Sequence, residues 1–338
     1  MKAVVLVGGE GTRLRPLTLT TPKPLIPVMD RRFLDLVLDL LARHDVQEVV
    51  LSSPYLEETF RSFVESRRDD LPVIRWITET EPLGTGGAVV NALDHLADDD
   101  LVFALNGDIL TDLDLTAMLE FHRQRGASVT ISLTHVEDAR PFGLVLTEAD
   151  GRVREFLEKP ADPIPGDVNA GTYLIDPAVL HGFARGEASS IERQIFPAVI
   201  ADGRPVYGFV SDAYWMDLGT PEKYLQGHFD IFEGRVRDLV YPAPWVHRAA
   251  DVHLRAHLGR WVAVGAGAVV GEDATVEDSV VHPGGRIGAG ARVVSSIIGA
   301  NALVGAGATV VDSVLGQGAE VPANAELEGE RVAGPPAG

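Results

Sequence analysis

The sequence contains no cysteine, which excludes disulfide bonds and thiolate metal ligands. This composition is compatible with a reducing compartment, so we expect the protein in the cytoplasm. The sequence also lacks any apolar run near the roughly 20 residues that a membrane-spanning helix needs. The short apolar run at residues 3–7 leads into glycines instead of a cleavage site, so we interpret it as a first strand and not as a signal peptide. We therefore expect a soluble globular protein without a membrane partner.

Basic residues are scarce: 29 lysines and arginines stand against 49 aspartates and glutamates, which gives a formal net charge of −20. This balance argues against nucleic acid as a partner, because such a partner requires a basic surface. A polyanionic ligand would need a divalent cation or a local cluster of basic side chains. Lysine is the rarer of the two cations, yet it stands in Pro22-Lys23-Pro24 and in Glu158-Lys159-Pro160. We interpret these two lysines as compact ammonium groups that suit a specific anion.

A glycine-rich loop follows the first strand, and residues 8–27 read GGEGTRLRPLTLTTPKPLIP. Glycine allows backbone N–H groups to approach phosphate oxygens closely. Arg13 can contact two such oxygens at once, and Lys23 adds a point charge. The spacing matches neither the G-x-G-x-x-G dinucleotide motif nor the G-x-x-x-x-G-K-[ST] phosphate loop. The composition of the run nevertheless predicts a polyphosphate-binding segment.

Strand-like and helix-like patterns alternate over residues 1–232. Apolar runs predict strands at residues 2–7, 46–52, 73–78, 101–106, 128–135 and 171–176. Helical periodicity predicts helices at residues 33–44, 56–66, 87–96 and 115–125. Such alternation is typical of an α/β domain with a Rossmann-like, mostly parallel sheet, in which ligands bind beyond the carboxyl ends of the strands. The loop at residues 8–11 and the sequence Asn106-Gly107-Asp108 both fall at such ends.

A repeat of about six residues follows a connector at residues 233–250. In units such as VGAGAV at 264–269, a branched apolar residue leads and small residues follow. This period predicts a left-handed parallel β-helix of hexapeptide repeats over residues 251–328, with a disordered tail at 329–338. We expect the coils to serve structure and homo-oligomer formation. Some coils of this kind belong to acyltransferases, but the one weak candidate, His282, is expected to be a solvated corner residue.

The glycine-rich run as a whole resembles the N-terminal motif of the sugar nucleotidyltransferases, or NDP-sugar pyrophosphorylases, in which G-G-x-G-T-R-L-R-P-L-T precedes P-K-P. Further segments are similar to motifs of the same family, in the family's order, over about residues 1–232. These segments are EPLGTGGA at 81–88, LNGD at 105–108, FLEKP at 156–160, NAGTY at 169–173 and YWMDLGTP at 214–221. The family also includes members with a C-terminal β-helix.

The resemblance implies a reaction in which a sugar 1-phosphate attacks the α-phosphorus of a nucleoside triphosphate and pyrophosphate leaves. Positioning and charge neutralisation dominate the catalysis of such a step. The resemblance implies catalytic roles for Arg13, Lys23 and Asp108, and a Mg²⁺ ion bound by Asp108 and Asp217. The implied nucleotide-binding residues are Leu6, Gly8, Gly9, Gly11, Thr12, Arg13, Lys23, Glu81, Gly84, Thr85 and Gly86. The implied sugar-phosphate-binding residues are Gly143, Glu158, Lys159, Asn169 and Thr172.

Some of these residues also have structural interpretations. Outside the motif set, an aspartate after Asn-Gly, such as Asp108, is typical of a turn. The alternative for Glu158 is a surface ion pair with Lys159. Asp112 and Asp114 are expected to be a turn residue and a helix cap, not further metal ligands.

Several segments are most similar to those of mannose-1-phosphate guanylyltransferases, among them residues 81–88, 106–110, 190–192 and 215–217. The resemblance therefore implies GTP and mannose 1-phosphate as substrates and GDP-mannose as product. Uridylyl or thymidylyl transfer to glucose 1-phosphate is an alternative, because pocket shape decides which orientation of one sugar hydroxyl is accepted. A non-catalytic regulatory subunit that binds nucleotide sugar is a further alternative, although such proteins typically lose the charged residues that are present here.

Overall fold

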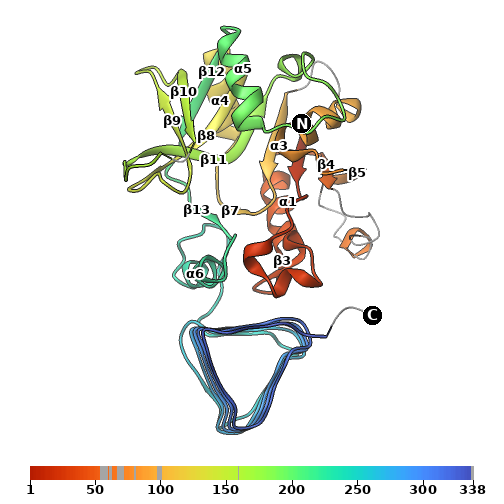
Figure 1. The fold of residues 1–338 in the computed structure, drawn as a ribbon, viewed down its shortest axis with the longest axis vertical. Coiled ribbons are helices and arrows are strands. Elements are labelled where there is room, and N and C mark those ends of the chain that lie inside the picture. The colour runs from red at the N-terminus through yellow and green to blue at the C-terminus, as the bar shows by residue number, and fades with distance from the viewer. Residues whose placement is uncertain are drawn as a thin grey trace. The chain divides into compact units, whose positions relative to one another are not determined.

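The structure is a computed structural model that describes residues 1–53, 60, 63–66, 72–79, 81–96, 101–158 and 160–335, with only the backbone of Glu158. The chain divides into two compact units (Figure 1). Unit 1 comprises Met1–Gly9 and Val37–Trp215, and unit 2 comprises Glu10–Leu36 and Met216–Gly338. This division differs from the predicted boundary at residue 232, since residues 10–36 belong with the C-terminal part of the chain. The glycine-rich loop therefore begins in unit 1 and continues in unit 2.

A nine-stranded sheet forms the centre of unit 1. Its strands are β1 (Lys2–Leu6), β4 (Glu48–Ser53), β5 (Val73–Thr78), β6 (Val102–Asn106), β8 (Val129–Val136), β9 (Gly143–Thr147), β10 (Val153–Glu158), β11 (Gly166–Ile175) and β12 (Val206–Val210). The main hydrogen-bonded order is β10-β9-β11-β6-β1-β4-β5, and β8 pairs with β11 and β12. The pairs β1–β4, β1–β6, β4–β5 and β8–β12 are parallel, whereas β11 runs antiparallel to β6, β8 and β9. The predicted α/β fold with a Rossmann-like, parallel-rich sheet is confirmed.

Helices alternate with the strands of this sheet along the chain. They are α1 (Phe33–Arg43), α3 (Gly84–Asn91), α4 (Leu115–Arg125) and α5 (Phe196–Ala201), with short helices η4 (Ala92–His95), η5 (Pro177–Val179) and η6 (Ile191–Ile195). Asp114 caps α4 because its side chain accepts a hydrogen bond from Ala117 N at 2.9 Å. The predicted helices at 33–44 and 115–125 are confirmed, and the one at 87–96 starts earlier, at Gly84. The predicted helix at 56–66 lies largely outside the described residues. Within the described ranges, every helix is too short or too polar to span a bilayer.

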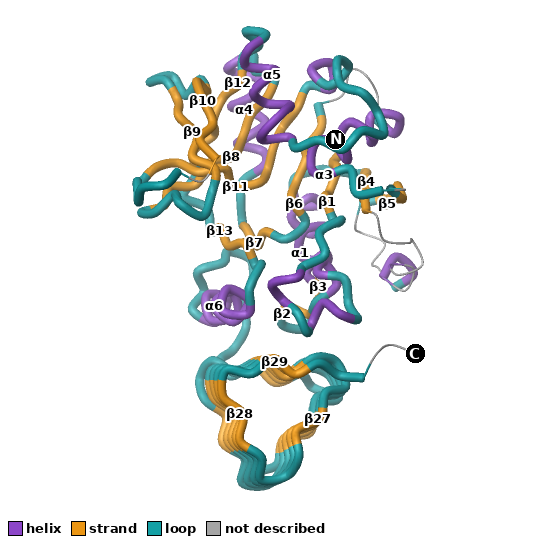
Figure 2. Tube along the Cα trace, in the orientation of Figure 1, coloured by secondary structure: helices purple, strands orange, loops and turns teal. Residues whose placement is uncertain are grey.

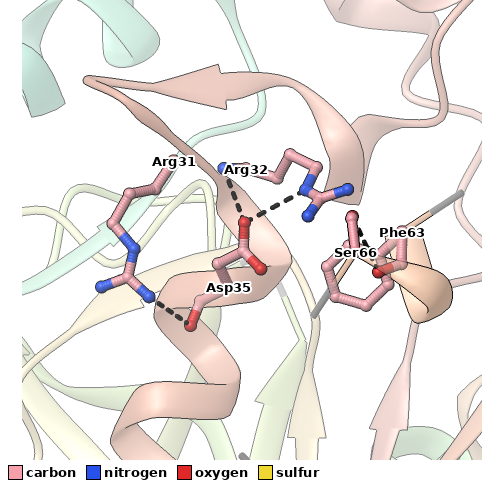
Figure 3. Close-up of polar contacts among 5 residues, drawn as sticks. All are labelled: Arg31, Arg32, Asp35, Phe63 and Ser66. Atoms are coloured by element: carbon pink, nitrogen blue, oxygen red, sulfur yellow. Dashed lines mark hydrogen bonds and ion pairs between the residues drawn. The ribbon is translucent and has the colours of Figure 1, made fainter. Parts of the chain in front are cut away.

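Asp35 holds the first turn of α1 (Figure 3). Its Oδ2 accepts hydrogen bonds from the backbone N of Arg32 at 3.0 Å and from Arg32 Nε at 3.1 Å. Arg31 Nη2 donates to the backbone O of Asp35 at 3.3 Å. A carboxylate in a first turn satisfies N–H donors that the start of a helix leaves without partners. In the other helical turn drawn in Figure 3, Ser66 Oγ donates to Phe63 O at 3.2 Å.

Unit 2 begins with short elements and continues with α6. They are η1 (Thr12–Leu14), η2 (Leu17–Leu19), η3 (Lys23–Leu25), β2 (Pro27–Val28), β3 (Arg31–Arg32) and α6 (Pro221–Phe232). The short strands β7 (Ile109–Thr111) and β13 (Trp215–Asp217) complete the part of the chain before the repeats. Pro221 suits the first position of α6, and Thr220 Oγ1 accepts a hydrogen bond from Lys223 N at 3.3 Å. The segment that contains Asp217 therefore leads directly into a capped helix.

The repeats fold into stacked coils with strands on three sides, as Figure 2 shows for β27, β28 and β29. The strands are β14 (Trp245–Val246), β15 (Asp251–Val252), β16 (His257–Leu258), β17 (Ala263–Val264), β18 (Val269–Val270), β19 (Thr275–Glu277), β20 (Val280–Val281), β21 (Arg286–Ile287), β22 (Arg292–Val294), β23 (Ile297–Ile298), β24 (Leu303–Val304), β25 (Thr309–Val311), β26 (Val314–Leu315), β27 (Glu320–Val321), β28 (Glu326–Glu328) and β29 (Arg331–Val332). They form three parallel sheets, β14-β17-β20-β23-β26-β29, β15-β18-β21-β24-β27 and β16-β19-β22-β25-β28. This arrangement is consistent with the predicted left-handed β-helix.

The coils extend beyond the predicted range of 251–328. β14 lies in the predicted connector and pairs with β17, and β29 lies in the predicted disordered tail and pairs with β26. The prediction of disorder is therefore wrong for the residues of β29. The physical reason is stacking, since each coil provides the backbone partners and the apolar cover for the next one. Inside the stack, Val281, Ile298 and Leu315 lie in successive coils and are at most 1% exposed.

Candidate active site

The part of the glycine-rich loop in unit 2, residues 10–27, is named the phosphate segment here. It turns sharply at Gly11, which adopts a φ of 60°. A Cβ at Gly11 would lie 2.9 Å from Thr18 Cγ2, and Thr18 Oγ1 donates to Gly11 O at 2.8 Å. Both the positive φ and the close contact require glycine at this position. The sequence therefore folds the phosphate segment back on itself, which presents Arg13 and Lys23 from one compact turn.

Both predicted cations of the phosphate segment meet the carboxylate of Asp217. Lys23 Nζ lies 3.6 Å from Asp217 Oδ1, and Arg13 Nη2 lies 3.8 Å from Asp217 Oδ2. The Lys23 side chain is only 8% exposed, whereas that of Arg13 is 64% exposed. Burial fixes the ammonium of Lys23 in place, while the guanidinium of Arg13 remains accessible to a ligand. Three residues that the sequence predicts as site residues are thus together in unit 2.

A third cation, Lys223, approaches the same carboxylate from the first turn of α6. Its Nζ lies 3.6 Å from Asp217 Oδ2, and its side chain is 34% exposed. The sequence analysis assigned no function to Lys223. Two signals in the sequence point to it: lysine is rare in this chain, and Lys223 stands six residues after Asp217. Three positive groups around one carboxylate form a local basic cluster in a chain whose net charge is −20.

The surroundings of Asp217 leave one of its oxygens without a hydrogen bond. Asp217 Oδ1 is buried and accepts no hydrogen bond from any described residue. A Cβ at Gly219 would lie 2.8 Å from both Asp217 Oδ1 and Arg13 Nη2, so glycine allows the backbone to approach both groups closely. A hard cation prefers such carboxylate oxygens. The described residues contain no cluster of three or more His, Cys, Asp or Glu side chains placed to hold a metal.

Asp108 lies just beyond the end of β6, in unit 1. There Leu6 of β1 pairs with Asn106, and Gly107 N donates to Leu6 O at 2.9 Å. A Cβ at Gly107 would lie 2.8 Å from Leu6 O, which explains why glycine precedes Asp108. Asn106 Oδ1 is a second buried oxygen that accepts no hydrogen bond from the described residues. The edge of the sheet therefore carries a carboxylate and an unsatisfied amide oxygen at the position where ligands of α/β sheets bind.

A cleft of about 910 Å³ opens in unit 1. Its lining includes two of the predicted nucleotide-binding residues, Gly84 and Thr85, and two of the predicted sugar-phosphate-binding residues, Gly143 and Asn169. The other lining residues are Pro82, Phe142, Phe156, Ala188, Ser189, Ser190, Glu192, Arg193 and Pro197. A concave site with aromatic walls and a few polar groups is typical of small-ligand binding. The structure thus brings together residues from segments that are far apart in the sequence.

A hydrogen-bond network organises one wall of this cleft around Glu192, in η6. Glu192 Oε2 accepts from Thr85 Oγ1 at 3.0 Å and from Ser190 Oγ at 2.8 Å. Glu192 Oε1 accepts from Tyr173 OH at 3.0 Å, and Asn169 Nδ2 donates to the same phenol oxygen at 2.8 Å. Burial, together with the negative charge of Glu192, raises the pKa of Tyr173 well above its usual value, so the phenol keeps its proton. Sequence reasoning noted Glu192 only within a similar segment and gave it no function.

Other predicted residues lie elsewhere. Thr172 is 2% exposed, its N donates to Ser132 Oγ at 3.2 Å, and it does not line the cleft. Gly86 is also buried, and a Cβ there would lie 2.7 Å from Ser189 Oγ, so its glycine allows close packing behind the cleft. The remaining predicted positions are partly or fully exposed: Leu6, Gly8, Gly9, Thr12 and Glu81. Lys159 and the side chain of Glu158 lie outside the described residues.

The expectation for His282 is wrong. It is 5% exposed, and its Nε2 lies 2.9 Å from Tyr224 OH of α6. The side chain is buried because α6 covers this corner of the β-helix, and burial lowers the pKa of His282 to about 3. Asp114 caps α4, as expected. Asp112 does not lie in a turn: it is 8% exposed, and its Oδ1 accepts a hydrogen bond from Tyr214 N at 2.8 Å, so it joins two segments that are distant in the sequence.

Comparisons with known proteins agree with the two parts of the chain. The family described as Nucleotidyl transferase matches residues 2–234, and the GMPPB C-terminal domain matches residues 240–335. A mannose-1-phosphate guanylyltransferase of Mycobacterium tuberculosis (strain ATCC 25618 / H37Rv) is 40% identical over 295 residues, which cover 84% of this chain and 80% of the relative. Mannose-1-phosphate guanylyltransferase 1 of Arabidopsis thaliana is 35% identical over 287 residues, which cover 83% of this chain and 79% of the relative.

Solved structures are also similar. The crystal structure of HddC from Yersinia pseudotuberculosis matches with a TM-score of 0.58 and 28% identity, covering 67% of this chain and 96% of that chain. A structure of the same protein complexed with GMP-PN matches equally well. The family match spans more than half of the chain, and a relative with 40% identity covers most of it. The chain therefore belongs to the nucleotidyl transferase family.

Proposed function

We propose that the protein transfers a guanylyl group from GTP to mannose 1-phosphate, giving GDP-mannose and pyrophosphate. A phosphate oxygen of mannose 1-phosphate forms a bond to the α-phosphorus of GTP. The bond from the α-phosphorus to the oxygen that bridges to the β-phosphorus breaks, and its electrons leave with pyrophosphate. The observation that carries the proposal is the convergence of Arg13, Lys23 and Lys223 on Asp217, which suits a polyphosphate. The choice of GTP and mannose is supported by the activity named for the relatives.

The chain's own contribution to this step is position and charge. Lys23 is held rigidly by burial and neutralises charge near the attacked phosphorus, while the accessible Arg13 stabilises the departing pyrophosphate. We propose that backbone N–H groups of Gly8, Gly9 and Gly11 contact phosphate, as such groups do in other anion sites. A Cβ at Gly9 would meet no atom within 4 Å, so packing alone does not explain that glycine.

We propose Mg²⁺ as the cofactor, held by Asp108 and Asp217. The residues fit this ion, since Asp217 offers a buried oxygen without a hydrogen bond and a carboxylate oxygen is a preferred ligand of Mg²⁺. When bound, Mg²⁺ would neutralise charge on the phosphates. In the absence of Mg²⁺, the positive charges of Arg13, Lys23 and Lys223 balance the charge of the Asp217 carboxylate.

We propose that the cleft of unit 1 binds the sugar phosphate and part of the nucleotide. Asn169 is held by Tyr173, which in turn is held by Glu192, so its amide is oriented for sugar hydroxyls. Gly143 allows close approach of a ligand to the backbone, and Thr85 contacts the same Glu192 from the nucleotide side. Glu158 and Lys159 complete the proposed set, the first for a sugar hydroxyl and the second for the sugar phosphate. The remaining proposed contacts are with Leu6, Thr12, Glu81 and Gly84, whereas Gly86 and Thr172 are buried and support the walls of the cleft from behind.

Two further properties belong to the proposal. We propose a homo-oligomer, because the flat sides of a coil stack favour symmetric self-association. We also propose a cytoplasmic location, which the absence of cysteine supports. Size-exclusion chromatography with light scattering tests the first property, and fractionation of the source cells tests the second.

The test of the reaction is pyrophosphate release by the full chain with Mg²⁺. GTP, UTP, dTTP, ATP and CTP are each combined with mannose 1-phosphate and with glucose 1-phosphate. The proposal expects the largest kcat/KM for GTP with mannose 1-phosphate. A larger value for another pair would contradict the proposed substrates but retain the reaction type. No release from any pair by folded protein would contradict catalysis and favour a non-catalytic nucleotide-sugar-binding protein.

A further inference from the structure

One outer face of the β-helix differs from the others. In the sheet β14-β17-β20-β23-β26-β29, the outward positions Val280, Ile297 and Val314 are 4%, 0% and 5% exposed. They do not belong to the apolar cluster inside the coils. In the neighbouring sheet, the corresponding outward residues Arg286 and Leu303 are exposed. An apolar, buried outer face indicates that the rest of unit 2 packs against this side of the coils.

The contacts of this side involve the phosphate segment and α6. Gln317 Oε1 accepts a hydrogen bond from Thr20 Oγ1 at 3.0 Å. A Cβ at Gly316 would lie 3.0 Å from Pro16 Cβ, so the backbone of the coil lies directly against the proline ring. Tyr224 OH donates to Pro27 O at the other end of the phosphate segment and lies 2.9 Å from His282 Nε2. The β-helix therefore supports the phosphate segment at several points along its length.

Arg331 interrupts the apolar column at the last coil. It pairs with Val314 in the strand register, but it carries a guanidinium where the three preceding coils carry valine or isoleucine. Its Nη1 donates to Arg13 O at 3.0 Å and to Arg15 O at 3.5 Å. The pKa of Glu222, in α6, is lowered chiefly by hydrogen bonds from the Thr220 side chain and the Glu222 backbone. The positive charge of Arg331 lowers it further, by a smaller amount. One side chain thus reaches both the phosphate segment and the helix that follows Asp217.

We propose that Arg331 is a positioning residue for the nucleoside triphosphate, because it fixes the two backbone carbonyls on either side of Leu14. The carbonyl of Arg13 lies in η1, and that of Arg15 lies at the residue that ends η1. Holding both carbonyls sets the direction in which the Arg13 side chain leaves the backbone. A cation that is already in place loses less entropy when phosphate binds. The β-helix therefore contributes to triphosphate binding through the phosphate segment. The inference rests on the proposed function where it concerns KM. The expected change in hydrogen exchange does not depend on that function.

The experiment compares Arg331→Gln with Arg292→Gln in the full chain. Arg292 is the matched control, since it is an exposed arginine on another sheet of the same coils and its Nη2 pairs with Glu277 at 3.3 Å. Three quantities are measured: hydrogen exchange of a peptide that covers residues 10–16, KM for each substrate, and the urea midpoint of unfolding. Arg331→Lys is the second variant, because it retains the charge and one donor.

For Arg331→Gln we expect exchange at residues 10–16 to rise about threefold or more. We expect KM for GTP to rise about fivefold, with KM for mannose 1-phosphate changed less than about twofold. The urea midpoint should remain that of Arg292→Gln, and Arg331→Lys should recover part of the GTP affinity. Equal exchange and equal KM for GTP in Arg331→Gln and Arg292→Gln would overturn the inference while the proposed reaction stands.

If the wild-type chain is inactive with every substrate pair, GTP binding by calorimetry replaces KM. Weaker binding and faster exchange in Arg331→Gln would then support the positioning function although the proposed reaction has failed. Unchanged binding and exchange would overturn it. A lower urea midpoint in Arg331→Gln alone, without a change in exchange at residues 10–16, would assign Arg331 to general stability and overturn the inference as well.

Discussion

Lys23 Nζ lies 3.6 Å from Asp217 Oδ1, and this pair joins the phosphate segment to the strand that leads into α6. The two side chains come from distant parts of the sequence, and both are largely buried. A buried pair of this kind persists only when both charges have partners, and Arg13 and Lys223 supply further positive charge to the carboxylate. The cluster is thus a preformed group of charges, to which the proposed function assigns a polyanion and a divalent cation.

The carboxylates of the proposed metal site can be tested by Asp217→Asn and Asp108→Asn. Each substitution removes one negative charge without changing size, so we expect kcat to fall about 100-fold or more and the Mg²⁺ concentration for half-maximal rate to rise. The measurement is initial rate against Mg²⁺ concentration. Asp212→Asn, an exposed aspartate close to Asp217 in the chain, is the control. Wild-type rates in both site variants would contradict the metal assignment.

Gly219 tests whether the space beside Asp217 is used. In Gly219→Ala, the new Cβ would lie 2.8 Å from Asp217 Oδ1 and from Arg13 Nη2, so both side chains must shift. We expect kcat/KM for GTP to fall about tenfold, with a change in unfolding free energy below about 1 kcal/mol. Gly182→Ala is the control, since a Cβ there would meet no atom within 4 Å. Equal kinetics in the two variants would show that ligands do not need this space.

Glu192 tests the organisation of the cleft. Its two oxygens accept from Thr85, Ser190 and Tyr173, so Glu192→Gln places an NH₂ group opposite hydroxyl donors. We expect KM for mannose 1-phosphate to rise about tenfold, because Tyr173 and Asn169 lose their orientation. Steady-state kinetics with each substrate varied in turn measures this effect. Glu187→Gln, at an exposed position just before η6, should leave KM unchanged, and an equal rise in KM there would argue against the network.

The buried histidines predict a dependence of stability on pH. Burial lowers the pKa of His228 to about 4 and that of His282 to about 3, against about 6.5 when unfolded. The unfolded chain therefore binds more protons below pH 6.5. The free energy of unfolding should fall as the pH decreases from about 6.5 towards 4, by up to about 1.4 kcal/mol per pH unit for each histidine, and should not change for this reason above pH 7.

Urea unfolding at pH 7.5, 6.5, 5.5 and 4.5 measures this dependence. His282→Gln should show a shallower loss of stability with acid than the wild-type chain. His257→Gln replaces an exposed histidine of the same β-helix and should retain the wild-type slope. Parallel slopes for all three proteins would mean that His282 is not buried in its neutral form.

The outer face of the β-helix can be tested with a charge. Ile297 is fully buried on that face, whereas Leu303 is 38% exposed at an outward position of the neighbouring sheet. We expect Ile297→Asp to reduce the free energy of unfolding by about 3 kcal/mol or more, because an unpaired carboxylate is then buried. Leu303→Asp should change it by less than about 1 kcal/mol. Chemical denaturation measures both, and similar small effects would show that nothing covers this face.

The sequence predicted those features that depend on local pattern. Apolar runs gave the strands, the six-residue repeat gave the β-helix, and ordered motifs gave Arg13, Lys23 and Asp217, which the structure brings together. Features that depend on contacts between distant segments could not be predicted. Glu192 and Lys223 have ordinary local surroundings, and their partners come from other elements. The error on His282 has the same cause, since a repeat defines the inside of a coil but not what packs against its outside.

The central claim is guanylyl transfer by a site built around Arg13, Lys23 and Asp217. Its most direct test is ³¹P NMR of the full chain incubated with GTP, mannose 1-phosphate and Mg²⁺. We expect the three GTP resonances to be replaced by the two of GDP-mannose and the one of pyrophosphate, and we expect this conversion to be lost in Asp217→Asn. Unchanged GTP and mannose 1-phosphate with folded wild-type protein, or hydrolysis to GDP and phosphate, would contradict it.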